Sequence, residues 1–89
     1  MARMIYTEGF LDDAACVYSP NVQADFENAL AAIEAFPRIG SADVPSSIRE
    51  QFGDGVLKAI VKPFDLIYEY LEEADSVVVY GLVPLRAAR

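Results

Sequence analysis

The 89-residue sequence contains no histidine and no tryptophan, and its only cysteine is Cys16. Without histidine, the chain lacks the commonest metal ligand and the side chain that most often acts as a general base near neutral pH. A single cysteine cannot form a disulfide within the chain and has no second thiol with which to share a metal. We therefore expect a protein of the reducing cytoplasm that carries no metal and no cofactor.

Long apolar runs are also missing. No uncharged stretch approaches the roughly 18 residues that a membrane-spanning helix requires, and charge enters at Glu8 and Asp12 before an apolar stretch can develop. We therefore expect neither a membrane segment nor a signal peptide. At 54% hydrophobic residues the chain is too apolar to be disordered. Its length suits one core, which predicts a single domain over residues 1–89.

Basic residues are scarce, with seven lysines and arginines against fourteen acids and a net charge of −7. Proteins that bind nucleic acids usually have the opposite balance, because their affinity comes mainly from neutralising phosphates. The sequence thus excludes a wholly basic protein but leaves room for a local basic patch. Only Arg3 lies in residues 1–36, and the other six follow: Arg38, Arg49, Lys58, Lys62, Arg86 and Arg89.

The first forty residues predict a strand and two helices. Residues 3–7 form a short apolar segment typical of a strand. Thr7 can cap a helix that follows, and Ser19, followed by a proline, can cap a second one that ends before Pro37. The apolar residues of the second helix share one stripe, which we expect to pack on a sheet: Val22, Phe26, Ala29, Leu30 and Ile33.

The second half predicts strands. After a loop over residues 37–47, apolar and polar residues alternate over 48–52, 56–62 and 64–71, whereas 76–83 is apolar on both faces, as central strands are. The short connections make these strands antiparallel. The order predicts an α+β fold: an N-terminal strand and a two-helix hairpin packed on a twisted antiparallel sheet of about four strands. The face away from the helices would carry Lys58, with Arg49 or Lys62 beside it.

Four segments occur in an order and spacing that cover nearly the whole chain. They are residues 29–33 followed by Phe36-Pro37-Arg38-Ile39-Gly40, Ser47-Ile48-Arg49, Phe64-Asp65-Leu66-Ile67-Tyr68-Glu69-Tyr70, and Val77-Val78-Val79-Tyr80-Gly81-Leu82-Val83 ahead of Arg86. Together they resemble the RelE/ParE superfamily of small bacterial toxins. The resemblance implies the toxin of a type II toxin–antitoxin (plasmid stabilization, or addiction) module that inhibits growth and is neutralised by a cognate, often acidic, antitoxin.

The resemblance implies one of two targets. The ParE branch poisons DNA gyrase, and the RelE branch cuts mRNA on the ribosome by making a 2′-hydroxyl attack the adjacent phosphate, which needs proton-transfer groups and cations. By resemblance, Lys58 and Arg86 are candidate catalytic residues. Asp65 stands at a position that is basic in the family, where a carboxylate would repel phosphate, and Pro84 replaces the family's histidine. The implied nuclease site is thus incomplete.

Candidate target-binding residues are Arg49, Lys62 and Arg89. Three functions stay open: a toxin that inhibits a protein such as gyrase, a ribosome-dependent endoribonuclease, and a degenerate member that binds an antitoxin-like partner without being toxic. The apolar composition also allows a homodimer.

Several of these residues also have plain structural interpretations. Lys58 can be a solvated strand residue, and Cys16 a small buried hydrophobe. The acids of the helices, Asp12, Asp13, Asp25 and Glu27, would form a solvated face. Residues 72–75 would form a charged turn rather than a metal site. Three tyrosines would be half-buried sheet residues rather than platforms that stack on bases: Tyr68, Tyr70 and Tyr80.

Overall fold

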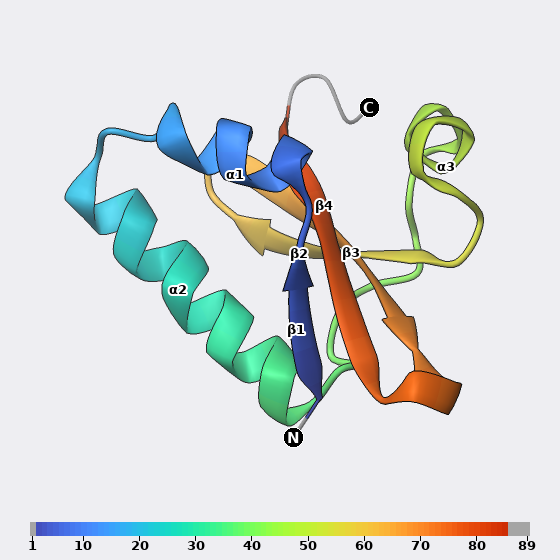
Figure 1. Cartoon of the computed structure of the whole chain (residues 1–89). Coiled ribbons are helices and arrows are strands. Elements are labelled where there is room, and N and C mark those ends of the chain that lie inside the picture. Colours follow the sequence, from blue (N-terminus) through green and yellow to red (C-terminus); the bar gives the residue numbers. More distant parts are fainter. Residues whose placement is uncertain (1, 86–89) are drawn as a thin grey trace.

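A computed structural model describes residues 2–85, so the candidate residues Arg86 and Arg89 lie outside the described part of the chain. Three helices and four strands follow one another along it (Figure 1). They are β1 (Arg3–Tyr6), α1 (Glu8–Ala15), α2 (Pro20–Ala35), α3 (Ser46–Phe52), β2 (Val56–Val61), β3 (Phe64–Leu71) and β4 (Ser76–Pro84), with a 3-10 turn at Glu72–Ala74 between the last two strands. Within residues 2–85, no helix has the length and apolar character needed to span a bilayer.

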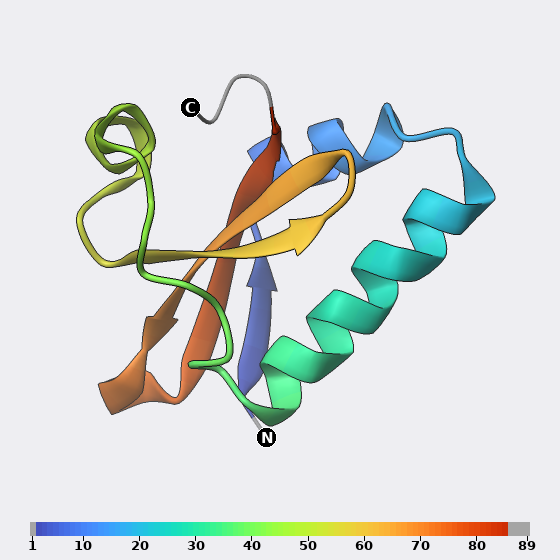
Figure 2. The ribbon, with the colours of Figure 1, turned by 180° about the vertical axis from the view of Figure 1, so that it is seen from behind.

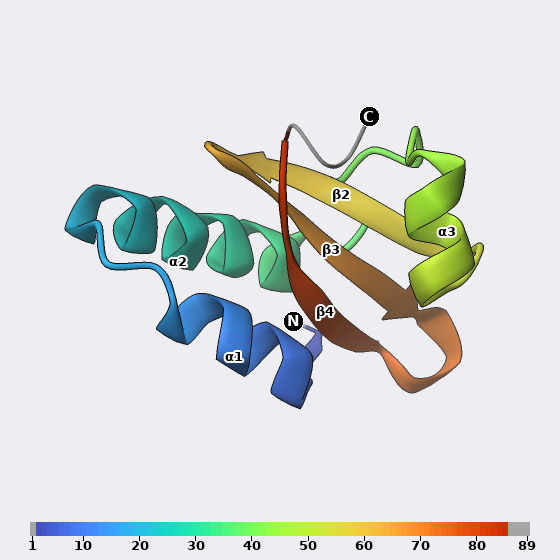
Figure 3. The same cartoon turned by 90° about the horizontal axis from the view of Figure 1, so that it is seen from above.

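The strands form one mixed sheet in the order β1-β4-β3-β2. β2, β3 and β4 pair antiparallel, as their short connections predicted, and β4 is an interior strand. β1 joins the edge but runs parallel to β4, because a pair of helices carries the chain away from its end and allows a crossover. The α+β prediction is therefore confirmed, with a mixed rather than a purely antiparallel sheet. Seen from above, α1 and α2 lie on one side of the sheet and α3 on the other (Figure 3).

Both predicted helix caps are present. The Thr7 hydroxyl oxygen accepts a hydrogen bond from the Phe10 amide at 3.2 Å, and the same hydroxyl donates to the Val79 carbonyl at 2.9 Å. Ser19 precedes Pro20 as the cap of α2, whose last residue is Ala35. Thr7 therefore both starts α1 and ties its beginning to β4.

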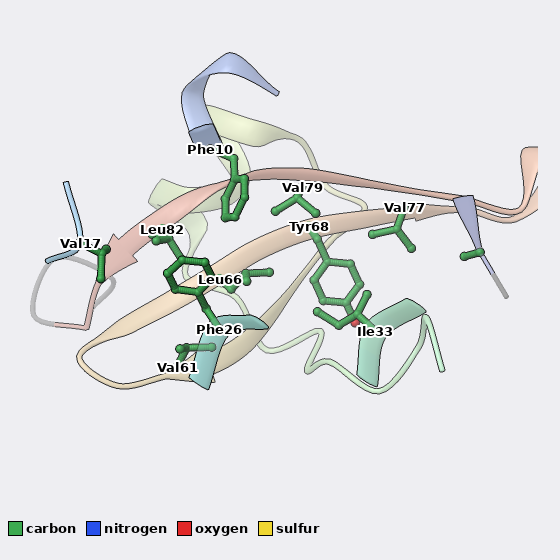
Figure 4. Close-up of a cluster of buried hydrophobic side chains, with 11 residues drawn as sticks. Phe10, Val17, Phe26, Ile33, Val61, Leu66, Tyr68, Val77, Val79 and Leu82 are labelled. Atoms are coloured by element: carbon green, nitrogen blue, oxygen red, sulfur yellow. The ribbon is translucent and has the colours of Figure 1, made fainter. Parts of the chain in front are cut away.

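The main core lies between α1, α2 and the sheet (Figure 4). Phe26 and Ile33 of the predicted stripe are buried, and Val22, Ala29 and Leu30 pack around them. They meet buried side chains of β3 and β4 that include Leu66, Tyr68, Val77 and Val79. The stripe on α2 is thus confirmed as the face that covers the sheet.

Residues 48–52 are not a strand, as the alternation predicted, but belong to helix α3. Ile48 and Phe52 are four residues apart, a spacing that fits one helix face as well as every second residue of a strand. Both side chains pack on the sheet face opposite α2, in a second cluster with Val44, Val56 and Ile67. The helix forms because this packing buries both residues from one side, and it covers part of the sheet face that also carries Lys58.

Cys16 is exposed, so its assignment as a buried hydrophobe was wrong. It caps the C-terminus of α1, where the helix turns toward Val17, and Val17 is the residue that enters the core. A single small residue at a helix end carries too little periodic information to fix its direction.

Tyr68 is fully buried in β3, and its hydroxyl joins the sheet to the segment that follows α2. The hydroxyl donates to the Pro37 carbonyl at 2.8 Å and accepts from the Gly40 amide at 2.8 Å. A Cβ atom on Gly40 would lie 2.5 Å from that oxygen and 2.9 Å from the Lys58 carbonyl oxygen. The close approach therefore requires glycine at position 40.

We expect Tyr68→Phe to lower the free energy of unfolding by about 1–3 kcal/mol, because it leaves the partly buried Pro37 carbonyl and Gly40 amide without their partner. Tyr18→Phe is the matched control, since Tyr18 is 86% exposed. Urea denaturation of the three proteins measures the difference. Equal midpoints for Tyr68→Phe and the wild type would contradict the role of the hydroxyl.

Candidate functional site

The predicted basic residues meet only partly in the structure. Lys58 is half-buried in β2, Lys62 is exposed just beyond that strand, and Arg49 is exposed on α3. Within residues 2–85 the one ion pair joins Arg38 to Glu72, at 2.6 Å, so none of the other three bases forms an ion pair there. Lys58 within β2 and Lys62 just beyond its end thus belong to one stretch of chain, whereas Arg49 lies on a different element, α3.

Asp65 lies on the same sheet face as Lys58. Its register partners are Ile60 on β2 and Val83 on β4, so it is diagonal to Lys58 across the β2–β3 pair. The residue is only 2% exposed, and its Oδ1 atom has no hydrogen-bond partner. Burial raises the pKa of Asp65 above its ordinary value of 3.8, and the nearby Lys58 ammonium lowers that pKa by a smaller effect. A phosphate at this place would meet a carboxyl group where it needs a cation.

The three tyrosines are engaged within the protein. Tyr68 is buried as described, the Tyr70 ring lies 5.3 Å from the guanidinium carbon of Arg38, and its hydroxyl donates to Asp75. Tyr80 donates to the Glu69 carboxylate at 2.8 Å and packs on Phe52. Burial, and next the bond to Glu69, raise the pKa of Tyr80, which keeps the phenol protonated at neutral pH. These contacts favour structural roles over base stacking or proton transfer.

The acidic turn between β3 and β4 is likewise a structural feature. Glu72 pairs with Arg38, and Asp75 accepts the bond from Tyr70 while its backbone adopts the left-handed conformation. Among residues 2–85, no group of histidine, cysteine and acidic side chains is arranged to hold a metal ion.

Asp13 has a role that its position on the solvated helix face did not reveal. Its Oδ2 atom accepts a hydrogen bond from the Leu82 amide at 3.0 Å. At the same place, the pairing of β4 with β3 shifts register between Ile67 and Tyr68, which frees backbone groups from the regular ladder. No sequence pattern marks this contact, because it joins residues 69 positions apart.

A groove of about 370 Å³ runs between α2 and the outer edge of β2. Apolar residues of the helix, the strand and the connecting loop line most of it: Ala29, Ala32, Ile33, Ile39, Ala59 and Ile60. Ile39 and Ile60 are 59% and 62% exposed, which is a large apolar exposure at one place on a small protein. The groove has the volume and apolar lining of a binding site.

Comparison with known proteins identifies the fold. No model of a protein family matches the sequence, and no curated protein matches it. The structure is similar to one chain of the intact E. coli RelBE toxin–antitoxin complex, with a TM-score of 0.72, 16% identity and coverage of 94% of this chain and 96% of that one. It is also similar to the isolated E. coli RelE toxin, with a TM-score of 0.73, 15% identity and coverage of 94% and 84%.

A third similar structure is an E. coli RelE double mutant in complex with a peptide of the antitoxin RelB, with a TM-score of 0.67, 16% identity and coverage of 91% and 80%. At these identities the comparisons establish the fold. The RelE-like architecture predicted from the sequence motifs is thus confirmed over nearly the whole chain.

Asp65→Asn tests the electrostatics of the site. Because the folded chain raises the pKa of Asp65, the stability that this carboxyl supplies is complete below pH 3.8 and is lost as the pH rises through the raised pKa. We expect the variant to exceed the wild type by about 1 kcal/mol in free energy of unfolding at pH 7, since it carries no buried charge. The advantage should vanish in acid.

Urea denaturation at a series of pH values checks this prediction, with the exposed turn variant Asp54→Asn as the control. A wild type more stable than Asp65→Asn at pH 7 would show that the carboxylate is stabilised rather than penalised by its surroundings.

Proposed function

We propose that this chain is the toxin of a bacterial type II toxin–antitoxin module, that it acts in the cytoplasm as one domain over residues 1–89, and that a cognate antitoxin neutralises it. The observation that carries the proposal is the agreement of the whole architecture with a toxin that has been solved alone and with its antitoxin. The exposed apolar groove beside β2 supports a protein partner, because such a surface gains stability when it is covered.

We propose that the target of this toxin is a protein, as it is for toxins that act on DNA gyrase. Three features support this choice over cleavage of ribosome-bound mRNA. The net charge of −7 opposes the approach of RNA. Asp65 sets a carboxyl group beside Lys58, where transition-state charge on a phosphate would need cations. Within residues 2–85, the tyrosines of β3 and β4 are buried or hydrogen-bonded inside the protein, which opposes their use in transferring the proton of a 2′-hydroxyl.

Growth experiments distinguish these functions. We expect expression of the chain alone to arrest growth, with filamentous cells and broken DNA, and the arrest to persist in the double variant Lys58→Ala/Arg86→Ala. Loss of one oxyanion-stabilising group typically costs a nuclease or protease about 10²–10³-fold in rate, so a nuclease that used these cations would lose its toxicity. Arg3→Ala, on the opposite edge of the sheet, is the control.

The alternatives give different results. Cleavage of mRNA at ribosomal A sites that disappears in the double variant would establish the nuclease in place of the protein-directed toxin. A chain that never arrests growth, yet co-purifies with the product of the adjacent reading frame, would be the degenerate member that keeps only partner binding. If the chain neither arrests growth nor forms a complex with that product, the proposal is overturned.

A further inference from the structure

We propose that two copies of this chain pair through the outer edges of their β1 strands, in a weak, two-fold symmetric dimer centred on Ile5. The inference concerns self-association and does not rest on the proposed function. In the strand order β1-β4-β3-β2 this edge lies at the end of the sheet opposite β2. The dimer would therefore leave the groove between α2 and β2 uncovered in both copies, as Figure 2, with β2 in front, makes plain.

The backbone of β1 directs alternate residues to its two sides. The Arg3 amide donates to the Asp75 carbonyl at 2.8 Å, at the start of the pairing between β1 and β4. Every second residue of a strand directs its amide and carbonyl to the same side, so Ile5 also faces β4. The amides and carbonyls of Met4 and Tyr6 consequently point the other way, to the outer edge.

This outer edge is open. β1 is the last strand of the sheet, and within residues 2–85 no backbone segment other than β4 bonds the amide or carbonyl of Met4 or Tyr6. Figure 1 shows β1 as the foremost strand, crossed by no helix or loop. These backbone groups are therefore free to pair with another strand, which is how exposed sheet edges associate.

Only one antiparallel register between two copies uses all of these groups. It sets Met4 of each copy opposite Tyr6 of the other as hydrogen-bonded pairs, with Ile5 opposite Ile5 on the symmetry axis. A register centred on Met4 would require the Ala2 amide, which already donates to a carbonyl of α2 at 3.1 Å. A register centred on Tyr6 would require Glu8, the first residue of α1. The edge is thus complementary to itself around Ile5.

The side chains match in the same register. Met4 packs against the main core, and the Tyr6 ring centre lies 5.7 Å from that of Phe10, so both side chains lie on the side of α1 and α2. Each Tyr6, 43% exposed, would contact Met4 of the other copy. Ile5, 40% exposed, lies on the opposite face, where the two isoleucines would meet at the close spacing of a non-hydrogen-bonded pair. Each copy would cover the exposed apolar surface of the other.

Charge favours a second copy as the occupant of this edge. Arg3 is the only base in residues 1–36. In this register it lies opposite the residue that precedes Glu8 of the other copy. Arg3 and Glu8 are both exposed, and neither forms an ion pair within residues 2–85. The two-fold axis therefore creates two reciprocal pairs of opposite charge, which stabilise paired strands.

The interface is small. β1 has only four residues, so the contact falls well below the roughly 1,600 Å² that a stable complex buries. We therefore expect a dissociation constant on the order of 10–100 µM, with the monomer prevailing in dilute solution.

Sedimentation velocity of the full-length chain from about 5 µM to about 1 mM tests the dimer. We expect the wild type to pass from monomer to dimer over this range. Ile5→Lys sets two ammonium groups against each other on the symmetry axis and should weaken association by at least about tenfold. Leu71→Lys is the matched control, since Leu71 is also 40% exposed but lies on the interior strand β3. It should associate as the wild type does.

A charge reversal tests the register without depending on the stability of any one variant. Arg3→Glu and Glu8→Arg each set like charges across the dimer, so either protein alone should associate about tenfold more weakly than the wild type. Mixed in equal amounts, the two variants restore both pairs of opposite charge, and the mixture should regain the wild-type affinity. A mixture that associates no better than its components would overturn this register and the proposal with it.

NMR spectra of the ¹⁵N-labelled chain at a series of concentrations locate the interface. We expect shift changes concentrated at Met4, Ile5 and Tyr6, and slower hydrogen exchange of the Met4 and Tyr6 amides in the dimer. A chain that stays monomeric at about 1 mM, dimers whose shift changes map to Ile60 on β2, or dimers unaffected by Ile5→Lys would overturn the inference. Seating of the product of the adjacent reading frame on β1 in place of a second copy would overturn it as well. Growth arrest and neutralisation are measured separately, so failure of the dimer leaves the proposed function intact.

Discussion

The buried hydroxyl of Tyr68 is the contact on which one edge of this protein depends. It accepts from Gly40 and donates to Pro37, so the segment leaving α2 is held against the middle of the sheet rather than released into solvent. That position brings Ser41 beside Lys58 and ends the pairing there. The groove between α2 and β2, which Gly40 and Ser41 help to line, follows from it. A polar group in the core thus specifies where the surface is left uncovered.

The two faces of the sheet have different energetic characters. Under α1 and α2, aromatic and aliphatic side chains form the main core, and the free energy of folding comes chiefly from their burial. On the other face, α3 covers Val56 and Ile67, and the remainder carries Lys58 together with a buried, incompletely bonded Asp65. The second face therefore includes a buried group that lowers the stability of the fold. The fold shared with RelE does not by itself carry RelE chemistry there.

Much of the architecture could be predicted from local patterns. The caps at Thr7 and Ser19, the stripe from Val22 to Ile33 and the doubly apolar β4 each depend on neighbours within a few residues, and each prediction was confirmed. The alternation over residues 48–52 was ambiguous, because a spacing of four suits both a strand and a helix. Tertiary packing of Ile48 and Phe52 on β2 and β3 decided for the helix. The prediction that Cys16 is buried was wrong for a related reason, because a residue at a helix end has too few helical neighbours to show which face it lies on.

Apart from α3, the sequence by itself determined the elements, their order and the charge: a strand, a helix pair, a three-strand meander and an excess of seven acids. It also showed that Asp65 places a carboxylate at a position where the family resemblance implies a basic residue. Only the tertiary structure decided that β1 runs parallel to β4, that Asp13 accepts a hydrogen bond from the Leu82 amide, and that the Tyr68 hydroxyl holds Gly40 against the sheet. The physical reason is range: capping and periodicity act between neighbours in the chain, whereas these contacts join residues brought together only when the whole sheet has formed.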